Sequence, residues 1–304
     1  MLQIRYPLAM ADKKRTEIDW QDVRVFLALG RHGSLSAAAR ALSVNHATIS
    51  RRIQSLELTL NEKLVERRPE GYVLTPAGMR TMDVASAMEA SVQTLGRGDV
   101  DDLPRGLVRI NAPPALSHGF LIERLARLPV MYPGLDIDLA TDLRSVSLER
   151  HQADIAVRIG KPLDGNFIAK PLGRLAFGYY GTDDVCCAVE AGGDPKFISF
   201  DEENSDMPEA LWLARHFPSA RVPFRANNHI AQATAARFGS GLALLPHYIG
   251  RQEPTLRLCQ LKNVPPPREA WLLIRPQDRK DLPIRAVADY LMATFEQEQG
   301  LFLD

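Results

Sequence analysis

The chain has 304 residues, of which 45% are hydrophobic, so it is long enough for about two domains with sizeable cores. Its 37 basic and 37 acidic side chains balance, so the net charge says nothing about nucleic acid and any electrostatic argument must be local. The sequence has neither a run of about 18 apolar residues, which would predict a membrane helix, nor a secretory leader, and this indicates a cytoplasmic protein.

Four segments of different character precede the C-terminal region. Residues 1–16 lack periodicity and are expected to be a flexible leader, with Met1 or Met10 as the natural start. Residues 17–75 show short helical patterns separated by turn residues, and residues 76–95 predict one longer helix. Residues 96–105, which include GRGDVDDLP, are predicted to be a hinge.

The first two predicted helices have the pattern of a packed scaffold. A helix over residues 20–32 places apolar side chains on one stripe and ends at Gly33, a residue suited to a left-handed stop. Ser34 or Ser36 can cap the next helix, whose AAARAL run has small side chains that let two helix axes approach closely.

The third predicted helix, which begins after Asn45 as its N-cap, has one packing face and one outer face. Its apolar stripe consists of Ile49, Ile53, Leu56 and Leu60. The residues opposite this stripe are Ala47, Ser50, Arg51 and Gln54. Two helices joined by a short turn, the second with a polar outer face, have the geometry that enters a DNA major groove.

A hairpin and a long helix are predicted to follow. Asn61 can adopt the left-handed conformation that ends the third helix, and the run KLVERRPEGYVLT predicts a short hairpin wing whose Arg67 and Arg68 can reach phosphate. Thr75 and Pro76 then open the long helix as N-cap and first residue.

The spacing in the long helix fits two interpretations. The helix has apolar residues at Met82, Ala85, Val92 and Leu95, with Met88 or Glu89 at the turn between them. This spacing fits the a/d seam of a coiled coil of about two heptads. Packing of the same residues on the rest of the protein explains the pattern equally well.

These residues together carry a family resemblance. The string WQDVRVFLALGRHGSLSAAARALSVNHATISRRIQSLELTLNEKLVERRPEGYVLTPAG resembles the DNA-binding domain of LysR-type transcriptional regulators, and the resemblance extends over essentially the whole chain. The chain departs from the family's usual pattern at Asn61, at Val65 and at His46, where the family commonly has glycine, phenylalanine and glutamine.

The resemblance implies roles for individual residues. It implies that bases are contacted by His46, Ala47, Ser50 and Arg51, with Gln54 on the same outer face. It implies phosphate contacts for Ser34, Arg52 and Arg67, and dimerisation through the linker helix. Basic residues exceed acidic ones by only one between residues 17 and 75, so we expect paired domains on a two-part site to supply the affinity.

Residues 106–304 are expected to form an effector-binding domain. Apolar strands alternate there with amphipathic helices, which predicts a mostly parallel α/β sheet with helices on both faces, including a helix over residues 115–131. The region is similar to the family's effector domain, and hence to periplasmic solute-binding proteins, in which two subdomains flank a cleft. We expect subdomain I at about 106–174 and 272–304, and subdomain II at about 175–271.

Candidate effector-binding residues follow the predicted strands or precede a helix, where backbone amides favour anions. They are Ala115, Ser117, Arg144, Arg158, Phe200, Asn228 and His229. Arg144 and Arg158 can clamp a carboxylate, which predicts an anionic or strongly polar effector, although surface ion pairs would explain both equally well. His229 can instead be a helix-terminus partner, and Ala115 replaces the Ser or Thr that the family often has there.

Two other functional classes are less favoured. An α/β enzyme with an appended DNA-binding domain is the alternative, but the sequence has no GxSxG motif, no Walker glycine loop and no metal-spaced histidines. A transported-solute receptor would need a signal peptide and would not carry a helix-turn-helix. The three cysteines fit buried reduced thiols, so neither metal nor cofactor is expected. The predicted partners are double-stranded operator DNA, a small effector and a second copy of the chain in a homodimer or homotetramer, with RNA polymerase as a further candidate.

Overall fold

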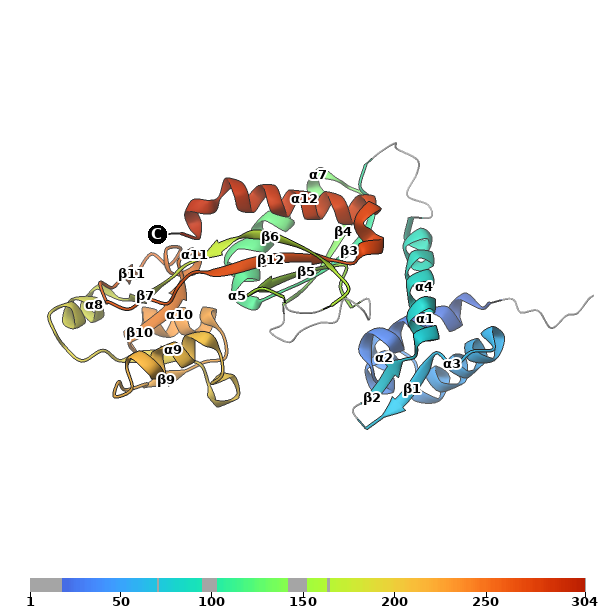
Figure 1. The fold of residues 1–304 in the computed structure, drawn as a ribbon, viewed down its shortest axis with the longest axis horizontal. Coiled ribbons are helices and arrows are strands. Elements are labelled where there is room, and N and C mark those ends of the chain that lie inside the picture. The colour runs from blue at the N-terminus through green and yellow to red at the C-terminus, as the bar shows by residue number, and fades with distance from the viewer. Residues whose placement is uncertain (1–17, 70, 95–102, 142–151, 163–164, 304) are drawn as a thin grey trace, which may run out of the picture. The chain divides into compact units, whose positions relative to one another are not determined.

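The computed structural model describes residues 18–69, 71–94, 103–141, 152–162 and 165–303 (Figure 1). The chain divides into two compact units: residues 18–94 with Gln152 belong to the first, and residues 103–141 and 153–303 to the second. The predicted leader, residues 96–102 of the predicted hinge, and Arg144 lie outside the described residues.

The first unit begins with three helices whose ends are set by local hydrogen bonds. They are α1 (Trp20–His32), α2 (Leu35–Leu42) and α3 (His46–Leu60). Gly33 ends α1 with a φ of 65°, Ser34 caps α2 by accepting from the amide of Ala37 at 3.2 Å, and Asn45 caps α3 by accepting from the amide of Thr48 at 2.8 Å. The predicted starts and stops are confirmed because each depends on neighbouring residues.

A two-stranded hairpin follows α3, as predicted. Asn61 ends α3 with a φ of 52°, and β1 (Val65–Arg68) pairs antiparallel with β2 (Gly71–Leu74). The amide of Tyr72 donates to the carbonyl of Gly33 at 2.7 Å, and a Cβ at Gly71 would lie 2.5 Å from that oxygen. The hairpin therefore packs against the end of α1, which a side chain at Gly71 would prevent.

The long helix α4 (Pro76–Thr94) starts as predicted. The hydroxyl oxygen of Thr75 accepts from the amide of Gly78 at 2.9 Å and donates to the carbonyl of Lys63 at 2.6 Å. A Cβ at Gly78 would lie 2.0 Å from the carbonyl oxygen of Leu64, so this close approach of helix and hairpin requires glycine.

The predicted coiled-coil seam is wrong in its first half. Met82 and Ala85 are buried in the core of their own unit beside residues of α1, so this part of the pattern reflects packing within the chain. Leu95 lies outside the described residues. The exposed apolar residues of α4 that repeat every fourth position are Val84, Met88 and Val92.

The second unit contains two five-stranded sheets, which agree with the two expected subdomains, but neither sheet is mostly parallel. The first has the order β4 (Leu135–Thr141), β3 (Gly106–Ala112), β5 (Ile155–Ile159), β12 (Arg268–Ile274), β6 (Ile168–Leu175). The second has the order β11 (Arg257–Leu258), β7 (Phe177–Gly181), β10 (Leu242–Pro246), β8 (Phe197–Ser199), β9 (Phe224–Arg225).

Both sheets mix strand directions. In the first, β3 is parallel to β4 and β5, whereas β12 is antiparallel to β5 and β6. In the second, β8 is parallel to β9 and β10, whereas β7 is antiparallel to β10 and β11. The chain leaves the first sheet between β6 and β7 and re-enters it at β12, so the predicted boundary at 271/272 falls inside β12.

The predicted continuous helix over residues 115–131 is wrong. The segment contains α5 (Pro114–Leu116), the π-helical turn η1 (Ser117–Leu121), α6 (Ile122–Leu125) and, after a turn, α7 (Leu128–Met131). Pro129 lies at the start of α7, where its missing amide hydrogen does no harm, but it cannot continue a helix from α6. The other helical elements are α8 (Asp183–Glu190), η2 (Glu202–Asn204), α9 (Pro208–His216), α10 (His229–Arg237), α11 (His247–Gly250), η3 (Pro276–Lys280), α12 (Leu282–Gln297) and η4 (Gln299–Leu301).

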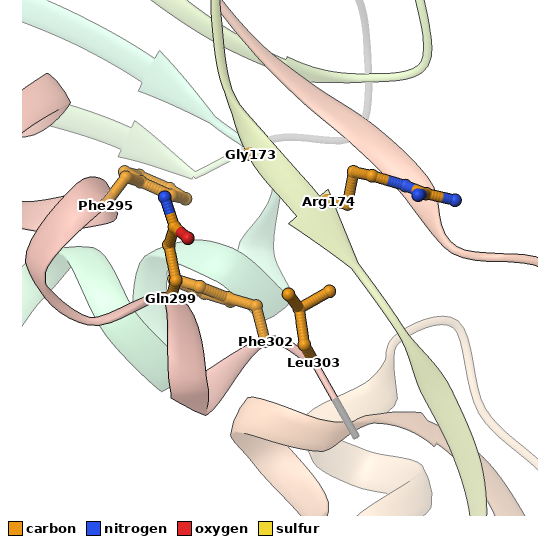
Figure 2. Close-up of a pocket in the computed structure, with 6 residues that line it drawn as sticks. All are labelled: Gly173, Arg174, Phe295, Gln299, Phe302 and Leu303. Carbon is orange, nitrogen blue, oxygen red and sulfur yellow. The ribbon is translucent and has the colours of Figure 1, made fainter.

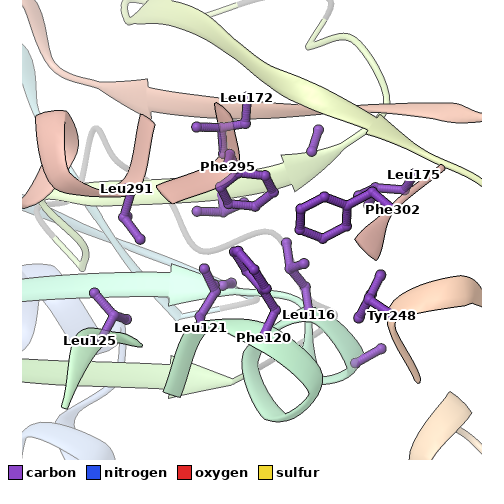
Figure 3. Close-up of a cluster of buried hydrophobic side chains, with 14 of the residues drawn as sticks. Leu116, Phe120, Leu121, Leu125, Leu172, Leu175, Tyr248, Leu291, Phe295 and Phe302 are labelled. Atoms are coloured by element: carbon purple, nitrogen blue, oxygen red, sulfur yellow. The ribbon is translucent and has the colours of Figure 1, made fainter. Parts of the chain in front are cut away.

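Aromatic packing holds α12 and the C-terminal residues to the segment after β3 (Figure 3). The ring of Phe120 meets those of Phe295 and Phe302 edge-on at 4.8 and 4.7 Å between centroids, and the latter two stack at 5.0 Å. This cluster contributes to one core that also contains residues of both sheets. None of the described helices has the length and apolar character needed to cross a bilayer.

Candidate DNA-binding surface and effector site

The outer face of α3 is open to solvent along its N-terminal half. His46, Ala47, Arg51 and Gln54 are exposed and Ser50 is half-buried, as expected from the burial of Ile49 and Ile53 on the other side. Five of the predicted DNA-contacting residues therefore share one accessible face of a helix whose first turn is fixed by the Asn45 cap.

Arg52 lies in a different setting from its neighbours. Its Nη1 donates to Asp22 at 2.8 Å and to Asp19 at 3.2 Å. The hydrogen bonds that Arg52 donates to Asp22 and then to Asp19 raise the pKa of its guanidinium. The contact ties α3 to the start of α1.

The other predicted phosphate contacts are placed differently. The hydroxyl oxygen of Ser34 accepts from Ala37 in the cap of α2, which leaves its O–H able to donate elsewhere. Arg67 is exposed on β1 opposite Tyr72, and the neighbouring Arg68 forms an exposed ion pair with Glu66 at 3.6 Å.

Glu57 holds the hairpin in place, a role that the sequence did not predict. Its carboxylate is buried and accepts from the amides of Leu64 at 2.9 Å and Val65 at 3.3 Å, and from Nζ of Lys63 at 2.6 Å. Burial alone would raise the pKa of Glu57, but these hydrogen bonds outweigh it and hold the pKa below its ordinary value. Glu57, the last residue of the run ISRRIQSLE, places an acidic side chain beside the apolar stripe of α3. This position was the one sign in the sequence that Glu57 has a special role.

On the first sheet, the predicted effector residues have different environments. Ala115 and Ser117 are buried, and the Ser117 hydroxyl donates to the carbonyl of Ala112 at 3.4 Å at the end of β3. Arg158 on β5 donates through Nη1 to the carbonyls of Val157 at 2.8 Å and Asn111 at 3.3 Å. Burial lowers the pKa of Arg158.

On the second sheet, the structure brings three predicted residues together. Asn228 caps α10 by accepting from the amide of Ala231 at 2.9 Å, and His229 follows it as the first residue of the helix. The ring of His229 meets that of Phe200 edge-on at 5.1 Å. Burial lowers the pKa of His229, so its imidazole is neutral at pH 7, and its Nε2 has no hydrogen-bond partner among the described residues.

An ion pair between a buried carboxylate and a half-buried arginine close to His229 was not predicted. Nη1 of Arg268, the first residue of β12, donates to Glu209 in the first turn of α9 at 2.9 Å. Besides burial, which lowers the pKa of His229, the charge of Glu209 raises this pKa and that of Arg268 lowers it. No local pattern marks Glu209, because its partner lies 59 residues away.

Two cavities lie near these elements. One of about 320 Å³ is lined by Phe177, Pro208, Glu209, Trp212, Pro265, Pro266 and Arg268. The other, of about 220 Å³, is lined by Gly173, Arg174, Phe295, Gln299, Phe302 and Leu303, and its Arg174 side chain extends away from the phenylalanines (Figure 2). None of the predicted effector residues lines either cavity, and the volume of the second cavity is below the ~300 Å³ typical of ligand sites. Among the residues that the structure describes, no three His, Cys, Asp or Glu side chains are grouped as metal ligands.

Comparison with protein families assigns both parts of the chain. Residues 101–296 match the family model described as LysR substrate binding domain. Residues 20–79 match the one described as bacterial regulatory helix-turn-helix protein, lysR family.

Curated relatives match over almost their whole length. The Mau operon transcriptional activator of Paracoccus denitrificans is 28% identical over 288 residues, which cover 92% of this chain and 98% of that protein. The AhcY transcriptional activator HvrB of Rhodobacter capsulatus is 27% identical over 296 residues, which cover 91% of this chain and 99% of that protein.

Solved structures show the same fold. ArgP from Mycobacterium tuberculosis superimposes with a TM-score of 0.61 at 17% identity, covering 92% of this chain and 98% of that one. The Vibrio cholerae virulence activator AphB does so with a TM-score of 0.51 at 21% identity, covering 90% of this chain and 99% of that one. At these identities the likeness concerns the fold alone.

Proposed function

Because the chain belongs to the LysR family of DNA-binding transcriptional regulators, we propose that it binds operator DNA as a homo-oligomer and responds to a small anionic or polar effector. Members of this family bind DNA and small effectors and form oligomers. A regulator of this kind acts on the chromosome, so the proposal includes a cytoplasmic location and contact with RNA polymerase.

The observation that carries the DNA-binding part is the exposed outer face of α3. His46, Ala47, Ser50, Arg51 and Gln54 lie near the N-terminal half of the helix, where side chains of a recognition helix meet base edges in the major groove. These residues are the proposed base contacts.

The proposed phosphate contacts are Ser34, Arg52 and Arg67. Arg67 on the exposed hairpin is the one best suited to this role, and Ser34 can donate its O–H. Arg52 is bound by Asp19 and Asp22, so it can reach a phosphate only through nitrogens other than Nη1 or by leaving the acids. Its observed contacts support a second role, which is to position α3 against α1.

Self-association is proposed to use α4. Val84, Met88 and Val92 are 63%, 40% and 41% exposed and repeat every fourth residue, so they share one face of the helix. An apolar face left open in this way is suited to pack against the same face of a second copy.

The effector is proposed to bind between the two sheets of the second unit, near Ala115, Ser117 and Arg158 of the first sheet's elements and Phe200, Asn228 and His229 of the second's. Arg144, which lies outside the described residues, stays part of this prediction. The chain is assigned no catalytic step, and turnover of a candidate metabolite by the purified protein would contradict this.

The test of DNA binding uses fluorescence anisotropy on DNA upstream of the protein's own gene. We expect His46→Gln to change the preferred sequence, and Arg67→Ala to weaken all sites alike while lowering the slope of log affinity against log salt by about one. Arg215→Ala, an exposed arginine on α9, is the matched control and should change neither. The docking is wrong if affinity and salt dependence are the same in all three variants and the wild type.

A further inference from the structure

The cavity beside the start of α9 has the size and lining of a small-molecule site. Its volume of about 320 Å³ lies within the range of ~300–1,000 Å³ found for ligand pockets. Its walls are the rings of Phe177 and Trp212 and the prolines Pro208, Pro265 and Pro266. The charged lining residues are Glu209 and Arg268, so the cavity combines apolar walls with one ion pair.

The ion pair leaves half of the Glu209 carboxylate unsatisfied. Glu209 is only 4% exposed, and its Oε1 accepts from Arg268. Its Oε2 is buried and has no hydrogen-bond partner among the described residues. A buried charged oxygen without a donor is unfavourable, so a donor at this position would stabilise the protein.

Arg268 uses two of its five N–H donors on acceptors within the protein. Nη1 donates to Glu209 at 2.9 Å and Nη2 to the carbonyl of Ile159 at 3.3 Å. A carboxylate placed next to the open acceptor of Glu209 would bury two like charges together, which is unfavourable. A cation, by contrast, is attracted to that oxygen.

The aromatic walls favour the same sign of charge. A cation near the face of Phe177 or Trp212 is attracted by the ring quadrupole, and an apolar ring packs well against both. His229, whose ring centroid lies 6.3 Å from that of Phe177, adds a second buried polar atom, its Nε2, that has no partner among the described residues.

We propose that this cavity binds the ammonium group of a small apolar or aromatic amine, which donates to Oε2 of Glu209 while the apolar body packs between Phe177 and Trp212. The inference rests on the proposed function insofar as it makes the amine a part of the effector that the second unit recognises. The amine complements the anionic or polar group expected near Arg158.

The test measures binding of three probes of one shape to the full chain by isothermal titration: benzylamine, benzyl alcohol and benzoate. We expect benzylamine to bind at least tenfold more tightly than benzyl alcohol, and benzoate to bind most weakly. Glu209→Gln, which keeps the size of the side chain but removes its charge, should weaken benzylamine at least tenfold and change benzyl alcohol less than twofold. Glu203→Gln, at an exposed position in η2, is the matched control and should leave all three affinities unchanged.

The proposal is overturned if benzylamine binds no more tightly than benzyl alcohol, or if Glu209→Gln binds it as the wild type does. Should Glu209→Gln fail to fold, the ranking of the three probes on the wild type decides together with Trp212→Leu, which should weaken benzylamine and benzyl alcohol alike. Operator binding by the same preparation separates the two proposals. A chain that binds DNA but ranks the probes otherwise contradicts only the amine site, whereas one that binds benzylamine through Glu209 but no operator contradicts only the proposed function.

Discussion

Glu57 offers the sharpest perturbation of the DNA-binding unit because one buried carboxylate holds the hairpin that carries Arg67. Glu57→Ala removes the acceptor of the Leu64 and Val65 amides and of the Lys63 ammonium. We expect the hairpin to become less stable and operator affinity to fall with it.

The size of the expected loss of stability in Glu57→Ala follows from the environment of each donor that loses its acceptor. Leu64 is fully buried, so its unpaired amide should cost about 1–3 kcal/mol, whereas Val65 is half-buried and its 3.3 Å bond can be replaced partly by water. The Lys63 side chain is 78% exposed, so its ion pair should contribute at most about 1 kcal/mol. Together these give a loss of about 2–4 kcal/mol, dominated by Leu64.

Backbone hydrogen exchange measures this loss locally. The reporter is the amide of Tyr72, which donates to Gly33 where the hairpin meets α1, and we expect its exchange to become roughly 30- to 1,000-fold faster. Glu57→Gln keeps one acceptor and should cost about 1 kcal/mol. Glu62→Ala, which removes only an exposed ion pair to Arg80, is the control and should change exchange little. Unchanged exchange at Tyr72 in Glu57→Ala would refute the role of this carboxylate.

The same group predicts a dependence on pH. Because the pKa of Glu57 is held below its ordinary value of 4.5 in the folded state, the ionised carboxylate contributes stability above that value. The contribution is lost as the pH falls through the lowered pKa. Acid should therefore speed Tyr72 exchange, after correction for its intrinsic rate, less in Glu57→Ala than in the wild type.

Three other predictions concern the second unit. Because the pKa of the buried His229 is lowered, the unfolded state takes up a proton at a higher pH than the folded state does. The free energy of unfolding is therefore at its full value above the ordinary histidine pKa of 6.5 and falls below it, by at most about 1.4 kcal/mol per pH unit. Denaturant unfolding at pH 7.5 and 5.5 should show a smaller difference between the two pH values in His229→Gln than in the wild type. Burial raises the pKa of Cys186, and it raises the pKa of Cys259 to about 12, whereas Cys187 is exposed. Iodoacetamide should therefore modify only Cys187 in the native protein, and equal labelling of all three cysteines by mass spectrometry would contradict this. Phe120→Ala should cost about 3–5 kcal/mol in denaturant unfolding because it removes a buried ring with two edge-on partners, and a change below 1 kcal/mol would mean that the cluster repacks.

The features that could be predicted from the sequence depend on neighbours within one turn. The caps at Ser34 and Asn45 and the left-handed stops at Gly33 and Asn61 each involve residues no more than five positions apart, so local rules suffice. The outer face of α3 follows in the same way from helical periodicity. The fold class was recognisable because an ordered series of such signals resembles one family.

Features set by distant partners were missed. Glu57 and Leu64 are seven residues apart across a turn, and Glu209 on helix α9 and Arg268 on strand β12 are 59 apart. A buried acid is indistinguishable in sequence from an exposed one until its donor is known. The alternation of strands and helices likewise could not show that β7 and β12 run antiparallel to their neighbours, because strand direction is fixed by the path of the chain between sheets.

Helix α4 illustrates why periodicity alone could not choose between contacts within the chain and between chains. Any apolar stripe repeats every three or four residues whichever surface covers it. Met82 and Ala85 are covered by α1, and the Arg31–Glu89 ion pair at 2.7 Å holds the next turn of α4 to the same helix, so this face is already occupied. The self-association proposed for α4 would therefore use the exposed face with Val84 and Met88 instead of the buried positions Met82 and Ala85. Charge at Val84 should consequently weaken self-association without destabilising the unit, whereas charge at Met82 should destabilise the unit itself.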